Sequence, residues 1–210
     1  MGLNTREVKA DLCVVGGGIA GTFAAISAAR QGVKVALVNE RPVLGGNASS
    51  EIRMWICGAQ QNGYRESGLN EELNIKNYYY NPDKNHYLFD LTLLGLVRAE
   101  KNIELILNAT VHAAKTNGDT ITSVTAYQMT TQTEITVTAK YFADCSGDSI
   151  LAPLTGAAFA IGRESKAETG ESMMYYGGAG DDKTMGNSLL IQARYVGKPV
   201  KFTAPDWAEK

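Results

Sequence analysis

Short apolar segments surround a helical, small-residue segment at the start of the chain. Residues 11–15 form an apolar, β-branched run that ends at a cluster of glycines, which is typical of a buried strand. Residues 19–30 are rich in alanine at helical spacing, and Gly32 stands where a helix C-cap is expected. Residues 33–38 form a second apolar run. This order predicts a strand–helix–strand unit whose two strands are parallel and central in a sheet.

The hydrophobic pattern changes after this unit. Residues 44–59 are irregular and rich in glycine, and residues 66–80 are polar and compatible with a helix. Residues 86–101 carry leucine and valine at helical spacing and lead into a strand at residues 103–107.

The pattern has a period of two over the following segment, which predicts strands. Asn117-Gly118 is a signal for a tight turn between two of these strands. The predicted strands lie near Val111 and at residues 121–127, 134–138 and 141–144. The first three form an antiparallel β-meander, and the last is followed by a second glycine loop with the sequence CSGDS.

These elements predict an α/β fold with a parallel central sheet and an antiparallel β-meander. We expect residues 1–155 to form a dinucleotide-binding domain with an irregular insertion at about residues 45–101. Residues 156–210 are rich in loops, with a late strand expected near residues 188–195. We interpret this segment as the beginning of a second, substrate-binding domain that is incomplete.

Composition limits the classes of partner. The 210 residues are 44% hydrophobic and 20% charged, with a net charge of −2, which is typical of a soluble globular protein. No basic region favours nucleic acid or a membrane surface, so neither is expected as a partner. The sequence has no apolar run of transmembrane length and no apolar signal-peptide core at its start, so we expect a cytoplasmic protein, with a lost leader left open.

The metal-binding and thiol residues are few. The three cysteines, Cys13, Cys57 and Cys145, are far apart and never form a Cys-x-x-Cys pair, and there are only two histidines. We therefore expect neither a disulfide framework nor a metal site.

The first glycine cluster carries the clearest chemical signal. GGGIAG places Gly16, Gly18 and Gly21 in Gly-x-Gly-x-x-Gly spacing between the first predicted strand and helix. Such glycines allow a tight turn, the approach of a diphosphate and close packing of helix on strand, and the anion meets the helix start at Ile19 and Ala20. The alternative is a glycine-rich turn that binds no ligand.

The residue that would hold the ribose of the dinucleotide is displaced. The position that usually carries an acid holds Asn39, and Glu40 comes one residue later. Successive strand residues point to opposite faces, so we expect Asn39 to keep the register and contact the ribose through its amide. We expect Glu40 to help hold the ribose only if the strand curls outward at its end, and the alternative for Glu40 is a solvated charge paired with Arg41. Arg41 itself suits phosphate contact or stacking on adenine.

The segment from residue 11 to residue 51 resembles the FAD-binding segment of flavoprotein oxidoreductases with the glutathione-reductase-like fold. It is most similar to the bacterial FAD-dependent oxidoreductase family, and ERPVLGGNAS also resembles fumarate-reductase-type flavoproteins. The resemblance implies a Rossmann-like FAD-binding domain, in which the Leu-Gly-Gly segment lies against the ribityl and diphosphate part of FAD. It continues through LNATVHA and YFADCSGD to about residue 165. The further positions that it implicates in cofactor binding are Gly45, Gly46, Asn47, Ala48, Ser49, Val111, Cys145, Ser146, Gly147 and Asp148.

Members of that family are normally longer and end with another Gly-Asp segment and helix. The chain therefore looks like the N-terminal portion of such a protein, and we expect low activity from it in isolation. The resemblance implies an FAD-dependent oxidoreductase that uses flavin for hydride transfer with a small polar organic substrate. The alternatives are a non-catalytic nucleotide-binding fragment and an NAD(P)-dependent dehydrogenase. The expected partners are the substrate and either the C-terminal remainder of the protein or further copies of the chain.

Residues near the expected flavin offer several chemical groups, but none is assigned as catalytic. Arg53 and Arg163 are candidates for binding an anion or substrate, Cys57 for a redox thiol and His86 for a general base. Single residues of these types are more often structural. The three tyrosines 78–80 favour packing at a loop or domain interface.

Overall fold

The computed structural model describes residues 2–56, 66–171, 179–186 and 194–207. The chain divides into two compact units, Met1–Ala160 and Ile161–Lys210, and each is considered by itself.

A four-stranded parallel sheet forms the centre of the first unit. Its strand order is β4-β3-β2-β8. The strands are β2 (Leu12–Val15), β3 (Val35–Val38), β4 (Ile103–Ile106) and β8 (Tyr141–Asp144). In register, Leu12 of β2 pairs with Val35 on one side and Tyr141 on the other. The predicted strand–helix–strand unit with parallel, central strands is confirmed.

The second sheet contains the predicted β-meander. Strands β5 (Ala109–Asn117), β6 (Thr120–Gln128) and β7 (Thr133–Thr138) are antiparallel neighbours, and the first turn lies at the predicted glycine, Gly118. A strand that the sequence analysis missed, β1 (Asn4–Lys9), pairs in parallel with β7. Only Val8 of β1 is buried, so the segment lacks the apolar pattern that predicts a strand.

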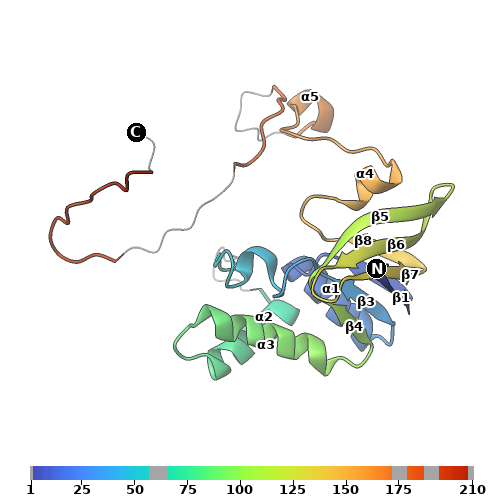
Figure 1. Cartoon of the computed structure of the whole chain (residues 1–210), viewed down its shortest axis with the longest axis horizontal. Helices are drawn as coiled ribbons and strands as arrows, with labels where there is room; N and C mark the ends of the chain where they lie inside the picture. Colours follow the sequence, from blue (N-terminus) through green and yellow to red (C-terminus); the bar gives the residue numbers. More distant parts are fainter. Residues whose placement is uncertain (1, 57–65, 172–178, 187–193, 208–210) are drawn as a thin grey trace. The chain divides into compact units, whose positions relative to one another are not determined.

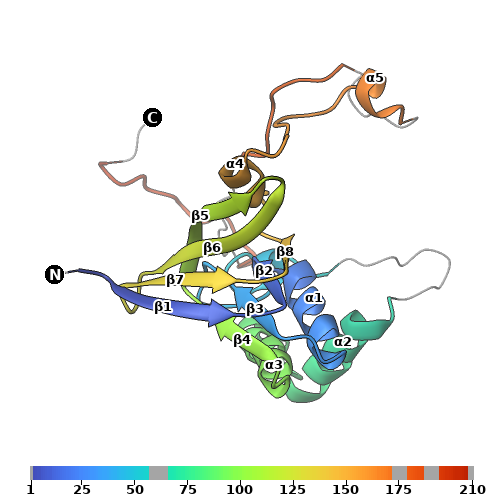
Figure 2. The same ribbon diagram turned by 90° about the vertical axis from the view of Figure 1, so that its right-hand side faces the viewer.

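Helices cover one face of the parallel sheet, and the second sheet covers the other face (Figures 1 and 2). The helices are α1 (Ile19–Arg30), α2 (Gly68–Tyr80) and α3 (His86–Ala99). Alternate residues of β2 enter the two cores: Val14 packs with the helices, whereas Cys13 and Val15 pack with the β-meander. This alternation explains why both central strands are continuously apolar.

One predicted strand and one predicted helix are longer than the observed elements, and hydrogen bonds explain the difference. The strand predicted from residue 33 begins at Val35, because the N–H of Val33 instead donates to the Ala28 carbonyl at the end of α1. The helix predicted to residue 101 ends at Ala99, and the N–H of Ile103 closes a turn onto the Glu100 carbonyl. The helices predicted at residues 66–80 and 86–101, within the insertion expected at about residues 45–101, are confirmed as α2 and α3.

The described residues contain no helix long and apolar enough to span a membrane. A short helix, α4 (Leu151–Thr155), follows β8 near the end of the first unit. The second unit contains α5 (Lys166–Thr169), which begins with a capping box formed by Ser165 and Glu168. Most of the strand predicted near residues 188–195 lies outside the described residues, and the remaining two positions form no strand.

Candidate functional site

The first glycine loop connects β2 to α1, as the motif predicts. Gly16 has φ +104°, and a Cβ there would lie 2.2 Å from the carbonyl oxygen of Cys145. A Cβ at Gly21 would lie 2.0 Å from the carbonyl oxygen of Gly16. Both positions need glycine because the backbone of the protein itself comes close to them.

Gly18 differs from the other two motif glycines. Its φ is −61°, which any residue can adopt, and a Cβ there would meet no described heavy atom within 4 Å. Neither packing nor conformation therefore requires glycine at this position. A bound ligand would explain the glycine at this position, because a diphosphate must approach the backbone closely at the second motif glycine.

The amino end of α1 suits an anion. Within the described part of the chain, no side chain caps this helix, and its first turn contains no acidic residue. The N–H and hydroxyl of Thr22 bond to the carbonyls of Gly18 and Gly17, at 2.9 and 3.0 Å, and hold the loop against the helix. Because free N–H groups and the helix dipole attract negative charge, this end of α1 can receive a phosphate at Ile19 and Ala20.

The Leu-Gly-Gly segment lies directly against the first glycine loop. The N–H of Gly45 donates to the Gly17 carbonyl at 2.8 Å, and a Cβ at Gly46 would lie 3.1 Å from the Cα of Gly18. The next residues form a single 3-10 turn that includes Asn47 and Ala48, and Ser49 is fully buried. The two glycine segments are therefore neighbours, and the contact of the Leu-Gly-Gly segment with FAD that the resemblance implies stays a prediction.

Asn39 is bound more tightly within the protein than expected. Its Oδ1 accepts from the N–H of Gly17 at 2.9 Å, and its Nδ2 donates to the carbonyls of Val43 and Arg41 at 2.9 and 3.1 Å. Both amide hydrogens are therefore already used, and Asn39 has none left to donate to a ribose. One acceptor lone pair of Oδ1 remains for a ribose hydroxyl, and that contact stays a prediction.

The charged residues after Asn39 take different positions. Glu40 is exposed, whereas the Nε of Arg41 donates to Oε2 of Glu51 at 2.9 Å. That bond, and more weakly the nearby charge of Glu40, raises the pKa of Arg41. The alternative pairing of Glu40 with Arg41 is thus replaced by a pairing with Glu51. The exposed carboxylate of Glu40 is available for a ribose at the same edge of the sheet.

The second glycine loop lies beside the first. The N–H of Cys145 donates to the Val15 carbonyl at 2.7 Å. Asp144, which the sequence analysis did not single out, accepts from the N–H and hydroxyl of Ser146, at 3.0 and 2.6 Å, and from the N–H of Leu151 at 2.7 Å. Asp144 and Ser146 therefore shape this loop where it leads into α4.

The remaining residues of the second loop leave its outer side open. Gly147 has φ +87°, a Cβ there would meet no described atom within 4 Å, and Asp148 is exposed. Burial, with a smaller effect of the Asp144 charge, raises the pKa of the Cys145 thiol. Cys145 is half-buried and packs against the core beneath the helices.

Val111 is buried in β5, next to an irregularity in the strand pairing. The register of β5 with β6 shifts between Val111 and Ala113, so one extra residue lies at this point. A bulge leaves backbone groups unpaired in the ladder. The predicted contact between the Val111 backbone and an adenine stays a prediction.

The other candidates within the described residues have separate local environments. The Nε of Arg53 donates to the Ser50 carbonyl at 3.0 Å, and Arg163 is paired with Asp181 in the second unit. His86 is exposed at the start of α3. Cys57 lies outside the described residues. The tyrosines 78–80 form the exposed end of α2 and not a loop, and their packing at a domain interface stays a prediction.

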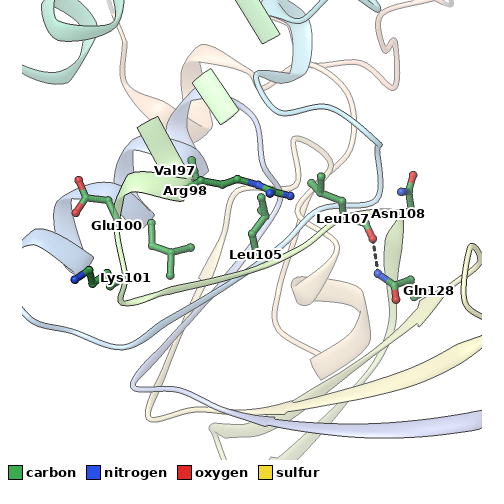
Figure 3. Close-up of a pocket in the computed structure, with 9 residues that line it drawn as sticks. Val97, Arg98, Glu100, Lys101, Leu105, Leu107, Asn108 and Gln128 are labelled. Carbon is green, nitrogen blue, oxygen red and sulfur yellow. Dashed lines mark hydrogen bonds between the residues drawn. The ribbon is translucent and has the colours of Figure 1, made fainter. Parts of the chain in front are cut away.

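Two of the surface hollows formed by the described residues contain no residue of the glycine loops. One, of about 510 Å³, runs along the edge strand β4 (Figure 3). Figure 3 shows the side chain of Arg98 extending toward Leu105 and Leu107, while Gln128 donates to the Leu107 carbonyl at 2.7 Å. The other, of about 490 Å³, borders α2. The glycine loops thus form a candidate nucleotide site that is separate from these hollows.

Comparisons of sequence and structure show which known proteins this chain resembles. No curated protein has a matching sequence. The FAD-dependent halogenase CndH, a myxobacterial enzyme, is 17% identical with a TM-score of 0.50, and the match covers 66% of this chain and 37% of the halogenase. A geranylgeranyl bacteriochlorophyll reductase-like protein from Thermoplasma acidophilum is 16% identical with a TM-score of 0.50, covering 73% of this chain and 44% of that protein.

These likenesses show the shared fold, and this chain spans less than half the length of either protein. The model of one protein family, described as FAD dependent oxidoreductase, matches residues 11–209. That match covers nearly the whole chain and confirms the predicted cofactor, FAD. The chain belongs to the FAD-dependent oxidoreductase family.

Proposed function

We propose that the chain supplies the FAD-binding portion of an oxidoreductase in which the flavin exchanges a hydride with a small polar organic substrate. The observation that carries this proposal is the open space in front of Gly18. That space faces the uncapped amino end of α1, and a Cβ at Gly46 would lie against the Cα of Gly18. The residues present therefore fit a dinucleotide whose diphosphate lies between the two glycine segments.

The proposal gives the neighbouring residues distinct roles. The first turn of α1 and the Gly45–Gly46 backbone hold the diphosphate, and Glu40 with the remaining acceptor of Asn39 holds the ribose. Asn47, Ala48 and Ser49 lie toward the ring, Val111 toward the adenine, and the second glycine loop, residues 145–148, closes the site from β8. When bound, FAD supplies the two-electron redox chemistry, and the protein supplies orientation and exclusion of water.

The experiment is a titration of the purified protein with FAD and, separately, with NADH. We expect a stoichiometric flavin spectrum, quenched flavin fluorescence and no comparable binding of NADH. A protein that binds NADH in preference would be a nicotinamide-dependent dehydrogenase instead. A protein that holds FAD but is not reduced by any of a panel of polar organic donors would support a nucleotide-binding role without catalysis.

A further inference from the structure

A buried carboxylate on α3 is bonded to the segment that follows the paired glycines. Asp90 is only 6% exposed, and its Oδ1 accepts from the N–H of Ser50 at 2.9 Å. Its Oδ2 is buried and has no hydrogen-bond partner among the described residues. Buried polar atoms without a partner are rare, so the presence of a carboxylate here needs an explanation.

We propose that Asp90 is a positioning residue for the cofactor: it fixes the twin-glycine loop, residues 45–54, to α3 so that the loop stays against the diphosphate site. This inference rests on the proposed FAD-binding function. It assigns a role to a residue that lies outside both glycine motifs.

The hydrogen bonds of the twin-glycine loop show why one external bond matters. Inside the loop, the N–H of Arg53 donates to the Ser49 carbonyl and the N–H of Met54 to the Asn47 carbonyl, both at 2.8 Å. These bonds shape the loop but do not hold it to the rest of the protein. At its first residue, Gly45 is bonded to the first glycine loop. Asp90 supplies a buried attachment five residues later, beside the exposed ion pair of Glu51 with Arg41.

Helix α3 supports the loop at two points on one face. Leu93, one turn beyond Asp90, is fully buried, and a Cβ at Gly45 would lie 3.3 Å from its Cδ2. Residues three apart on a helix lie side by side, so Asp90 and Leu93 form a continuous support. Leu93 contributes packing at Gly45, and Asp90 contributes a directed bond at Ser50.

A stability role alone does not explain the carboxylate. Burial of an unpartnered oxygen opposes folding, whereas loss of the acceptor for the Ser50 N–H costs one hydrogen bond, so the two effects of Asp90→Leu on stability oppose each other. Asp90→Leu should therefore melt close to the temperature of the wild type while the loop loses its attachment. Asp90→Asn keeps an oxygen that accepts from Ser50 and should retain the attachment.

The test compares Asp90→Leu, Asp90→Asn and the control Ser50→Ala, which keeps the backbone N–H. For each we measure the melting temperature of the FAD-free protein, amide hydrogen exchange in the twin-glycine loop and the Kd for FAD. We expect Asp90→Leu to exchange faster at Ser50 and to bind FAD about tenfold more weakly, the equivalent of one lost buried hydrogen bond. Asp90→Asn and Ser50→Ala should stay within about twofold of the wild type.

Three results would overturn the proposal. They are unchanged exchange and FAD affinity in Asp90→Leu, an Asp90→Asn variant as defective as Asp90→Leu, and a lowered melting temperature in Asp90→Leu that accounts for the weaker binding. If the wild type itself binds no FAD, the proposed function fails. Hydrogen exchange of the FAD-free variants still decides whether Asp90 holds the loop.

Discussion

The carbonyl oxygen of Gly17 accepts a hydrogen bond from the N–H of Gly45 at 2.8 Å, and this bond joins the two glycine segments of the site. The two residues are far apart in sequence, but the parallel pairing of β2 with β3 brings the loops after both strands to the same edge of the sheet. The side chain of Asn39 strengthens the junction by accepting from the N–H of Gly17. The phosphate loop and the twin-glycine loop therefore form one backbone surface.

Gly18→Ala should separate ligand binding from folding. A Cβ at Gly18 meets no described atom within 4 Å, so we expect the variant to fold with nearly unchanged stability. The same Cβ would occupy the space proposed for the diphosphate, so FAD affinity should fall about tenfold or more. The measurements are thermal melting of the FAD-free protein and flavin fluorescence titration.

The matched control is Gly95→Ala, because a Cβ at Gly95 also enters open space. Gly95 lies inside α3, where alanine is the better helix former by about 1 kcal/mol, so this variant should be more stable and bind FAD normally. An unchanged FAD affinity in Gly18→Ala would contradict the proposed position of the diphosphate.

Gly16→Ala should have the opposite effect. Gly16 has φ +104°, and its Cβ would lie 2.2 Å from the Cys145 carbonyl oxygen, so both the conformation and the packing reject a side chain. We expect destabilisation of at least about 3 kcal/mol, measured by urea unfolding of the FAD-free protein.

A second glycine variant separates the cost of backbone strain from the cost of a steric clash. Gly118→Ala, at φ +58° with open space around it, should show only the conformational cost of roughly 1–2 kcal/mol. Equal losses in the free energy of unfolding of the Gly16 and Gly118 variants would mean that the second glycine loop adds no steric cost at Gly16.

The sequence predicted the parts of the fold in which local pattern and burial agree. The central strands are continuously apolar because the helices cover one side of the sheet and the β-meander covers the other. The strand β1 escaped prediction because only Val8 is buried and its partner, β7, lies more than a hundred residues away. The first glycine motif was found because close backbone contacts restrict Gly16 and Gly21 to glycine, and that restriction is visible in sequence.

The finer parts of the site depend on contacts that a single sequence does not reveal. Asn39 was identified by its position, but the carbonyls that use its amide hydrogens belong to a turn whose shape no local pattern specifies. Asp144 shapes the second glycine loop only because its carboxylate meets the start of α4. Asp90 looks like an ordinary polar position in an amphipathic helix until its bond to Ser50 is known.

Asn39→Asp tests whether the amide donors of Asn39 hold the loop after β3. A carboxylate oxygen in place of Nδ2 would face the carbonyl oxygens of Val43 and Arg41, which the amide approaches to 2.9 and 3.1 Å. Because two acceptors repel and neither can donate, we expect a loss of about 1–3 kcal/mol in the free energy of unfolding. Urea unfolding at neutral pH measures it.

The control for Asn39→Asp is Glu40→Asp, which changes an exposed carboxylate at the next position and should leave stability unchanged. An Asn39→Asp variant as stable as the wild type would show that these two amide bonds do not determine the loop.

Glu72 of α2 should make stability depend on pH in the acid range. Arg30 of α1 donates to Glu72 of α2 at 2.7 Å and so joins α1 to α2. It also donates to Glu100, the residue after α3, at 2.6 Å. The hydrogen bond from Arg30, with smaller help from Lys76, lowers the pKa of Glu72 from 4.5 to about 2. A carboxylate with a lowered folded-state pKa stabilises the protein fully above the unfolded-state pKa, and the benefit disappears as pH falls toward the folded-state value.

Glu72→Ala should therefore cost about 1 kcal/mol at neutral pH, because the pair is partly exposed and screened by solvent. The difference from the wild type should stay constant down to about pH 4.5 and vanish near pH 2, the interval between the two pKa values. Urea unfolding across this range measures it, with Glu71→Ala as a control at the exposed neighbouring position. A difference that persists unchanged at the lowest pH would show that Glu72 stabilises the helices through packing and not through its charge.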